Sequence, residues 1–277
     1  MILHIDPAAP LWTREAAEAV LALHIAGATA ALLSGPAAMV FRKGGRLHRL
    51  SGNVFFVAML TMTGIGAVVA PMLNDPFSSV GGAFGFYLTA TGWAAAIRAP
   101  GRIGRFEPLA MLFILGVGAA VMVLASQIMA TPSGRLDGMP YQAAFVIAGL
   151  CALAAASDIS VILRGGVSGP ARIARHVWRI CLALLVVALS FAAQPKAQPA
   201  GLRGSPVFLI PALLILIGMI YWLVRIRLER RRPRGSVVAG AVAHARAGPQ
   251  LPPAGARPSS RRAPRQLQPR VPNTTMA

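Results

Sequence analysis

The sequence predicts an all-α protein: a bundle of seven transmembrane helices with the N-terminus outside and the C-terminus in the cytoplasm. Two features of the composition favour this class. Of the 277 residues 56% are apolar and only 13% are charged, about half of the ~25% that is usual for a soluble domain. The same composition excludes disordered, fibrous and disulfide-rich classes. The third feature is the placement of Lys and Arg, which alternates from one loop to the next.

Seven apolar stretches are long enough, at about 20 residues, to cross a bilayer. Each is expected to be a helix, because every backbone amide in lipid needs an internal hydrogen-bond partner. The predicted spans are residues 17–41, 50–73, 80–97, 108–130, 141–163, 173–193 and 206–226. They divide the chain into a short exported N-terminus (1–16), a seven-helix membrane domain (17–226) and a tail (227–277).

The loops predict the orientation, because Lys and Arg concentrate on the cytoplasmic side of a membrane. Loops one, three and five carry ten basic residues, namely Arg42, Lys43, Arg46, Arg49, Arg98, Arg102, Arg105, Arg164, Arg172 and Arg175. The N-terminus and the other three loops carry four, namely Arg14, Arg135, Lys196 and Arg203. Abundant Ala, Gly, Pro and Arg, with only two Lys in the chain, is typical of bacteria with GC-rich genomes. The chain is therefore expected to be a multi-pass protein of the bacterial inner membrane.

The net charge of +19 would suggest nucleic-acid binding in a soluble protein. Here the topology accounts for it, so the expected partner is the lipid bilayer and not nucleic acid. A run of arginines from Arg225 to Arg234 follows the last span directly. It is interpreted either as a site for anionic lipid headgroups or as a stop-transfer anchor. The Pro-, Arg- and Ala-rich residues beyond it have no apolar period and are expected to be disordered in the cytoplasm.

Small residues at four-residue spacing predict close helix contacts in the membrane. One such stripe is Gly27, Ala31 and Gly35 in the first span, and another is Gly81 and Gly85 in the third.

Polar residues inside the spans are the candidate functional residues, because they are costly in lipid. Asp158 lies six residues before Arg164, about 9 Å below the cytoplasmic end of the fifth span at ~1.5 Å per residue. Arg179 and His176 share a face of the sixth span, since residues i and i+3 are neighbours on a helix. His48 and Arg49 lie where the second span begins. These five residues therefore form a candidate polar cluster at one level on the cytoplasmic side.

Two interpretations of the cluster stay open. In the structural one, Asp158 neutralises Arg179 or Arg49, and the histidines form interfacial hydrogen bonds. In the functional one, the cluster binds a proton, an anionic ligand or a cofactor. Either way an Asp158–Arg179 contact is expected, because the fifth and sixth spans are joined by a short loop and should be adjacent.

Cofactor and catalytic signals are sparse. Haem b needs two facing histidines, and His48 with His176 would meet that need. His24 in the first span is an intramembrane candidate without a histidine partner at its depth. No H-E-x-x-H, Walker loop or G-x-S-x-G is present, and acidic residues are too few for a cage around a hard metal. No catalytic residue, metal site or resident cofactor is predicted, with haem b kept as an alternative.

Three sequence motifs resemble those of an uncharacterised family of bacterial inner-membrane proteins with a domain of unknown function. They are RKGGRLHR at 42–49, FYLTATGW at 86–93 and RHVWR at 175–179. The resemblance covers most of residues 20–228, and His24, His48, His176 and Arg179 match its motif positions, whereas the tail after Arg234 does not. It implies an inner-membrane protein and no particular reaction.

The predicted function is small-solute or proton handling through the cytoplasmic-side cluster. The alternatives are a haem b electron carrier and a structural or assembly partner of a membrane complex.

Overall fold

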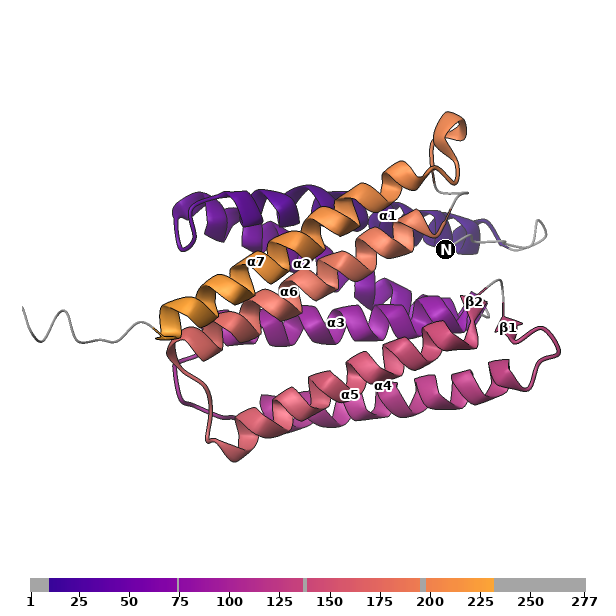
Figure 1. Cartoon of the computed structure of the whole chain (residues 1–277). Coiled ribbons are helices and arrows are strands. Elements are labelled where there is room, and N and C mark those ends of the chain that lie inside the picture. The colour runs from indigo at the N-terminus through magenta and orange to yellow at the C-terminus, as the bar shows by residue number, and fades with distance from the viewer. Residues whose placement is uncertain (1–9, 74, 137–138, 195–197, 232–277) are drawn as a thin grey trace, which may run out of the picture. The chain divides into compact units, whose positions relative to one another are not determined.

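The computed structural model of the protein describes residues 10–73, 75–136, 139–194 and 198–231. Seven long helices account for most of them, as Figure 1 shows. In chain order the elements are α1 (Leu11–Val40), α2 (Arg46–Val69), η1 (Ala70–Leu73), α3 (Pro76–Ile97), α4 (Phe106–Met129), β1 (Arg135–Leu136), β2 (Met139–Pro140), α5 (Tyr141–Leu163), α6 (Gly169–Ala192), η3 (Ala200–Leu202), η4 (Pro206–Leu209) and α7 (Ile210–Arg231). The predictions for residues 1–9 and for the tail beyond Arg231 lie outside the described residues.

All seven long helices are apolar and long enough to cross a membrane, as expected of a multi-pass membrane protein. Leucine and isoleucine side chains on the outer face of α7 are more than half exposed, for example Leu213 and Leu214. Such a face suits lipid and would be costly in water. The first helix begins at Leu11, six residues before the predicted span, because Ala and Glu are good helix formers and continue the helix beyond its apolar part.

Helix α3 lies in the middle of the packing. It contacts α2, α4 and α6, while α1 packs on α2 and α7 packs on α6. Helices α4 and α5 form a hairpin, joined through the antiparallel strands β1 and β2. The expectation that the fifth and sixth spans pack side by side does not hold for their backbones: α5 packs chiefly on α4, and α6 packs on α3 and α7.

Small residues determine how closely the first three helices approach. The predicted stripe of Gly27, Ala31 and Gly35 is the buried face of α1. In α3 the predicted Gly85 lies close to α2, since an added Cβ would be 2.8 Å from Thr63 Cγ2, but the closest backbone contact is made by Gly82 rather than by the predicted Gly81. A Cβ added at Gly82 would lie 2.4 Å from the backbone nitrogen of Ala67, whereas one added at Gly81 would meet nothing within 4 Å. The backbones of α2 and α3 therefore touch at Gly82, where no larger residue fits.

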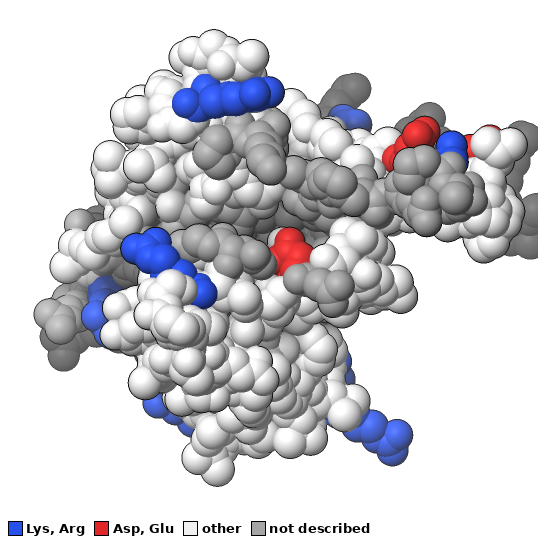
Figure 2. All heavy atoms as spheres, turned by 90° about the vertical axis from the view of Figure 1, so that its right-hand side faces the viewer, with Lys and Arg blue, Asp and Glu red and all other residues white. Residues whose placement is uncertain are grey.

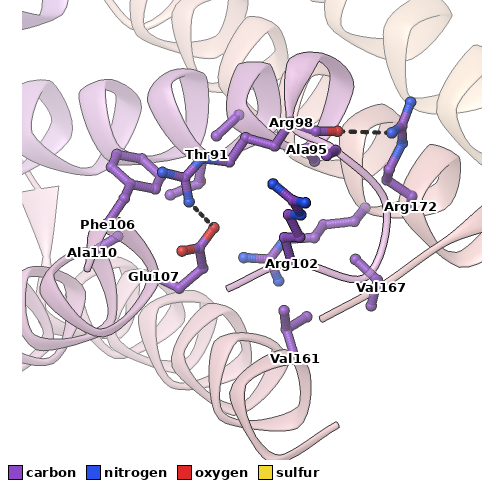
Figure 3. Close-up of a pocket in the computed structure, with 13 residues that line it drawn as sticks. Thr91, Ala95, Arg98, Arg102, Phe106, Glu107, Ala110, Val161, Val167 and Arg172 are labelled. Carbon is purple, nitrogen blue, oxygen red and sulfur yellow. Dashed lines mark hydrogen bonds and ion pairs between the residues drawn. The ribbon is translucent and has the colours of Figure 1, made fainter. Parts of the chain in front are cut away.

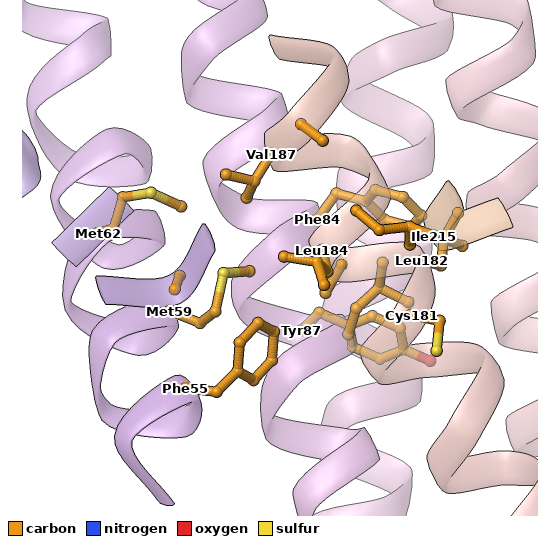
Figure 4. Close-up of a cluster of buried hydrophobic side chains, with 14 of the residues drawn as sticks. Phe55, Met59, Met62, Phe84, Tyr87, Cys181, Leu182, Leu184, Val187 and Ile215 are labelled. Atoms are coloured by element: carbon orange, nitrogen blue, oxygen red, sulfur yellow. The ribbon is translucent and has the colours of Figure 1, made fainter. Parts of the chain in front are cut away.

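The main hydrophobic core is built chiefly by α2, α3 and α6, and α1, α4, α5 and α7 also contribute buried residues. Figure 4 shows Phe55 and Met59 from α2 beside Phe84 and Tyr87 from α3, with Leu184 from α6 among them. These side chains are at most 2% exposed. The core thus joins helices distant in sequence and fixes α6 against α3.

The two ends of the bundle differ in charge. The loops after α1, α3 and α5 lie at the same end as the last turn of α7 (Figure 1). These loops, together with the first two turns of α2 and α6, carry the ten basic residues counted above. We call this the basic end. Figure 2 looks onto the opposite end, where α1 begins and where β1 and β2 lie, and charged side chains are sparse among its described residues.

Candidate functional site

Asp158 of α5 and Arg179 of α6 form an ion pair in the interior of the bundle. Arg179 Nη2 lies 2.6 Å from Asp158 Oδ1, and the side chains are 0% and 1% exposed. The expected Asp158–Arg179 contact is therefore present. It is made by the length of the arginine side chain, because the backbones of α5 and α6 do not pack closely.

A second arginine, Arg175, reaches the same carboxylate from one turn earlier in α6. Its Nη2 lies 2.5 Å from Asp158 Oδ1, and its Nη1 donates to the hydroxyl of Ser157 at 3.3 Å. From the sequence Arg175 was expected in a loop, but α6 begins at Gly169 and places Arg175 in its second turn. Arg175 and Arg179 are four residues apart, the spacing of neighbours on one helix face. The i, i+4 spacing to Arg179 could therefore have indicated from the sequence that Arg175 belongs to the same site.

Helix α3 completes the network with two hydroxyl groups that the sequence analysis missed. The Tyr87 hydroxyl donates to Asp158 Oδ2 and accepts from Arg179 Nη1 at 2.9 Å. Thr91 accepts a second bond from Arg179 Nη1. Tyr87 and Thr91 are again four residues apart and lie in the FYLTATGW motif. Three helices are thus joined by one buried polar group, named here the Asp158 network: Tyr87, Thr91, Asp158, Arg175 and Arg179.

The Asp158 network carries unbalanced positive charge, with two guanidinium groups against one carboxylate. Arg179 Nε is buried without a hydrogen-bond partner among the described residues. Buried positive charge that exceeds its counter-charge is costly, so this arrangement favours a further negatively charged group nearby.

A pocket opens beside the network at the basic end. Thr91 and Arg175 line it, together with Arg98, Arg102, Glu107 and Arg172. Figure 3 shows Glu107 paired with Arg98 on one side of the pocket and Arg172 on the other. Because Thr91 and Arg175 belong to both, the pocket leads directly to the Asp158 network. We call it the arginine pocket.

The loops around the arginine pocket are held against each other by their backbones. The amide of Gly101 donates to the carbonyl of Val167 at 3.1 Å. Gly166 has a φ of +117°, and a Cβ there would lie 2.7 Å from the backbone of Gly101. Only glycine allows both this conformation and this approach, so Gly166 positions the loop that carries Arg102.

The other predicted members of the cluster lie elsewhere. Arg49 is exposed and donates to the carbonyl of Gly44 at 2.6 Å. His48 Nδ1 is 2.9 Å from the carbonyl of Ala38, and His176 Nδ1 is 2.9 Å from the carbonyl of Gly92. None of these three forms a hydrogen bond or ion pair with Asp158 in the described part of the chain, and the wider cluster stays a prediction.

His24, His48 and His176 each place Nδ1 within hydrogen-bond distance of a backbone carbonyl. A carbonyl only accepts, so each Nδ1 carries the proton and leaves Nε2 as the available nitrogen. The bond of His24, whose Nδ1 is 3.1 Å from the carbonyl of Met62, ties α1 to α2.

Lys43 lies in the loop between α1 and α2, over the ring of Trp222 at 4.7 Å, and burial lowers the pKa of Lys43 below its usual value. Neither His48 nor His176 lines the arginine pocket, and the haem b alternative stays a prediction. Within the described ranges no group of three or more His, Cys, Asp or Glu is placed to hold a metal ion.

Comparison of the chain with models of protein families, with curated proteins and with solved structures gave no match in any of the three.

Proposed function

We propose that the chain is an integral protein of the bacterial inner membrane that passes a small solute through its arginine pocket, with the basic end in the cytoplasm. One observation carries the proposal: the buried Asp158 network, at the joint of three membrane-capable helices, shares two residues with a pocket open at the basic end. A purely structural ion pair needs no access from outside.

The contacts favour a solute over a relayed proton. Asp158 Oδ1 already faces two guanidinium groups, and Oδ2 accepts from Tyr87. A proton relay through Asp158 would have to break these contacts at each step. A solute entering the pocket meets side chains that are already oriented, which lowers the entropy cost of binding.

The orientation is supported by the ten basic residues at one end. Cytoplasmic loops carry an excess of Lys and Arg, so the arginine pocket would open toward the cytoplasm. The hairpin of α4 and α5 contacts the other helices mainly through α3 and through the side chains of the Asp158 network. We therefore assign the solute path to the interface between this hairpin and the rest of the bundle.

Osmotic swelling of proteoliposomes tests the proposal. Vesicles holding the full chain and valinomycin are transferred into isotonic potassium phosphate, potassium acetate or glycerol, and light scattering follows their swelling. We expect swelling faster than that of empty vesicles in at least one solution, and slower swelling with Asp158→Asn. Glu229→Gln, which changes an exposed ion pair on α7, is the control. Protein-dependent swelling in none of the solutions would overturn the proposal and favour an assembly partner.

A further inference from the structure

The arginine pocket has more arginines than carboxylates, and this excess of positive charge indicates the class of ligand that it would bind. Four arginines line it, Arg98, Arg102, Arg172 and Arg175, against the single carboxylate of Glu107. Behind it, Arg179 adds one positive charge and Asp158 one negative charge. The described residues of pocket and network together leave three positive charges unbalanced, so the chemistry selects an anion.

Three of the four arginines are held in place before any ligand arrives. Arg98 is paired with Glu107. Arg172 Nη1 donates to the carbonyl of Arg98 at 2.8 Å, and Arg175 is bound to Asp158. Carbonyls and carboxylates that occupy part of each guanidinium leave its other N–H groups in a fixed direction. A rigid set of donors loses less entropy on binding than a mobile one.

The fourth arginine, Arg102, differs from the others. It lines the pocket, yet it makes no hydrogen bond or ion pair with any residue that the structure describes. Figure 3 shows its side chain at the pocket, between the Arg98–Glu107 pair and Arg172. Its loop is anchored through Gly101 and Gly166. Arg102 is thus a cation positioned at the pocket and free to pair with a ligand.

The donor type narrows the anion further. A guanidinium group is a planar fork that matches the oxygens of phosphate or carboxylate with two parallel hydrogen bonds. The pocket also lies at the first turns of α4 and α6, whose N-terminal ends attract negative charge. Glu107 is itself an oxyanion in this place, and it accepts from Arg98 and from the amide of Gly104 at 2.8 Å.

We propose that the arginine pocket binds a phosphate-type oxyanion, with Arg102 as the residue that closes on it and Glu107 as the built-in carboxylate with which it competes for Arg98. This deepens the proposed function and rests on it. The phosphate belongs either to a free solute or to the headgroup of an anionic phospholipid.

The test measures thermal unfolding of the full chain in neutral detergent, with inorganic phosphate added against chloride at equal ionic strength. We expect phosphate to raise the Tm of the wild type. Arg102→Gln should weaken the apparent affinity by at least about tenfold, the loss expected for a hydrogen bond between charged groups. Arg105→Gln is the matched control, because Arg105 lies in the same loop but does not line the pocket. Glu107→Gln should strengthen binding, because it removes the competing charge.

Lipid composition separates the two sources of phosphate. In nanodiscs of phosphatidylcholine alone, a phosphate effect that depends on Arg102 indicates a free solute. A higher Tm in phosphatidylglycerol nanodiscs that is lost in Arg102→Gln, with no further effect of added phosphate, indicates a headgroup. Equal behaviour of Arg102→Gln and Arg105→Gln in every arm would overturn the site. Binding without swelling would overturn the proposed passage alone, and swelling that is insensitive to Arg102→Gln without phosphate binding would overturn the site alone.

Discussion

Asp158 and Arg179 are joined across two helices whose backbones do not pack on each other. Arg179 Nη2 reaches Asp158 Oδ1 at 2.6 Å with both side chains buried. Two hydroxyl groups of α3 lie beside this pair. The Tyr87 hydroxyl binds both partners, and the Thr91 hydroxyl binds Arg179. The polar contact therefore adds to the apolar packing that attaches the α4–α5 hairpin to α3 and α6.

This pair predicts non-additive mutational effects. Asp158→Asn leaves two buried guanidinium groups without a counter-charge and should destabilise the protein by about 3–5 kcal/mol. Adding Arg179→Gln should recover part of that loss, because one of the uncompensated charges is removed. Unfolding in mixed micelles of SDS and neutral detergent measures the double-mutant cycle. Glu229→Gln, in an exposed pair, should change little. Additive effects of the two changes would contradict direct coupling.

Tyr87→Phe tests the part of α3 in the network. The change removes a hydroxyl that donates to Asp158 and accepts from Arg179, while the ring still fills its place in the core. We expect a loss of about 1–3 kcal/mol, the cost of leaving a buried polar partner unsatisfied. Tyr141→Phe is the matched control, because its edge contact with Phe145 involves the ring alone. Equal unfolding free energies of the two variants would show that the Tyr87 hydroxyl is not part of the network's stability.

Two adjacent glycines of α3 should respond to the same substitution with opposite signs. At Gly82 a Cβ would lie 2.4 Å from Ala67 N and 2.7 Å from Thr63 O, so Gly82→Ala must push α2 and α3 apart, at about 1–3 kcal/mol. At Gly81 the space is open, and Gly81→Ala should stabilise the helix by about 0.5–1 kcal/mol. Thermal unfolding of both variants gives the comparison. A Gly82→Ala protein as stable as Gly81→Ala would mean that the helices do not touch there.

Reporter fusions test the orientation. Alkaline phosphatase joined after Arg230 should be inactive and a green fluorescent protein at the same place should be fluorescent, because the basic end is expected in the cytoplasm. Phosphatase inserted at Gly134, in the turn before β1, should be active as the control for the opposite side. An active phosphatase after Arg230 would reverse the whole arrangement.

The Asp158–Arg179 contact is predictable from the sequence, but the network around it is not. The spacing of Tyr87 and Thr91, and of Arg175 and Arg179, was visible in the sequence as two i, i+4 pairs. Hydroxyl groups in a span are ordinary, however, and only their position opposite a charge makes them significant. His48, Arg49 and His176 have the expected depth and yet bind backbone carbonyls elsewhere.

Sequence alone determined the number of membrane-capable helices and which loops are basic, because the bilayer acts on each segment separately through its length, its polarity and the charge of its flanks. Tertiary structure decided which helices face one another. With lipid as apolar as the side chains, hydrophobicity does not select partners, and close packing of small residues together with interhelical hydrogen bonds does. Gly82 therefore brings α3 against α2, and Asp158 finds both Arg175 and Arg179, through contacts that no single span contains.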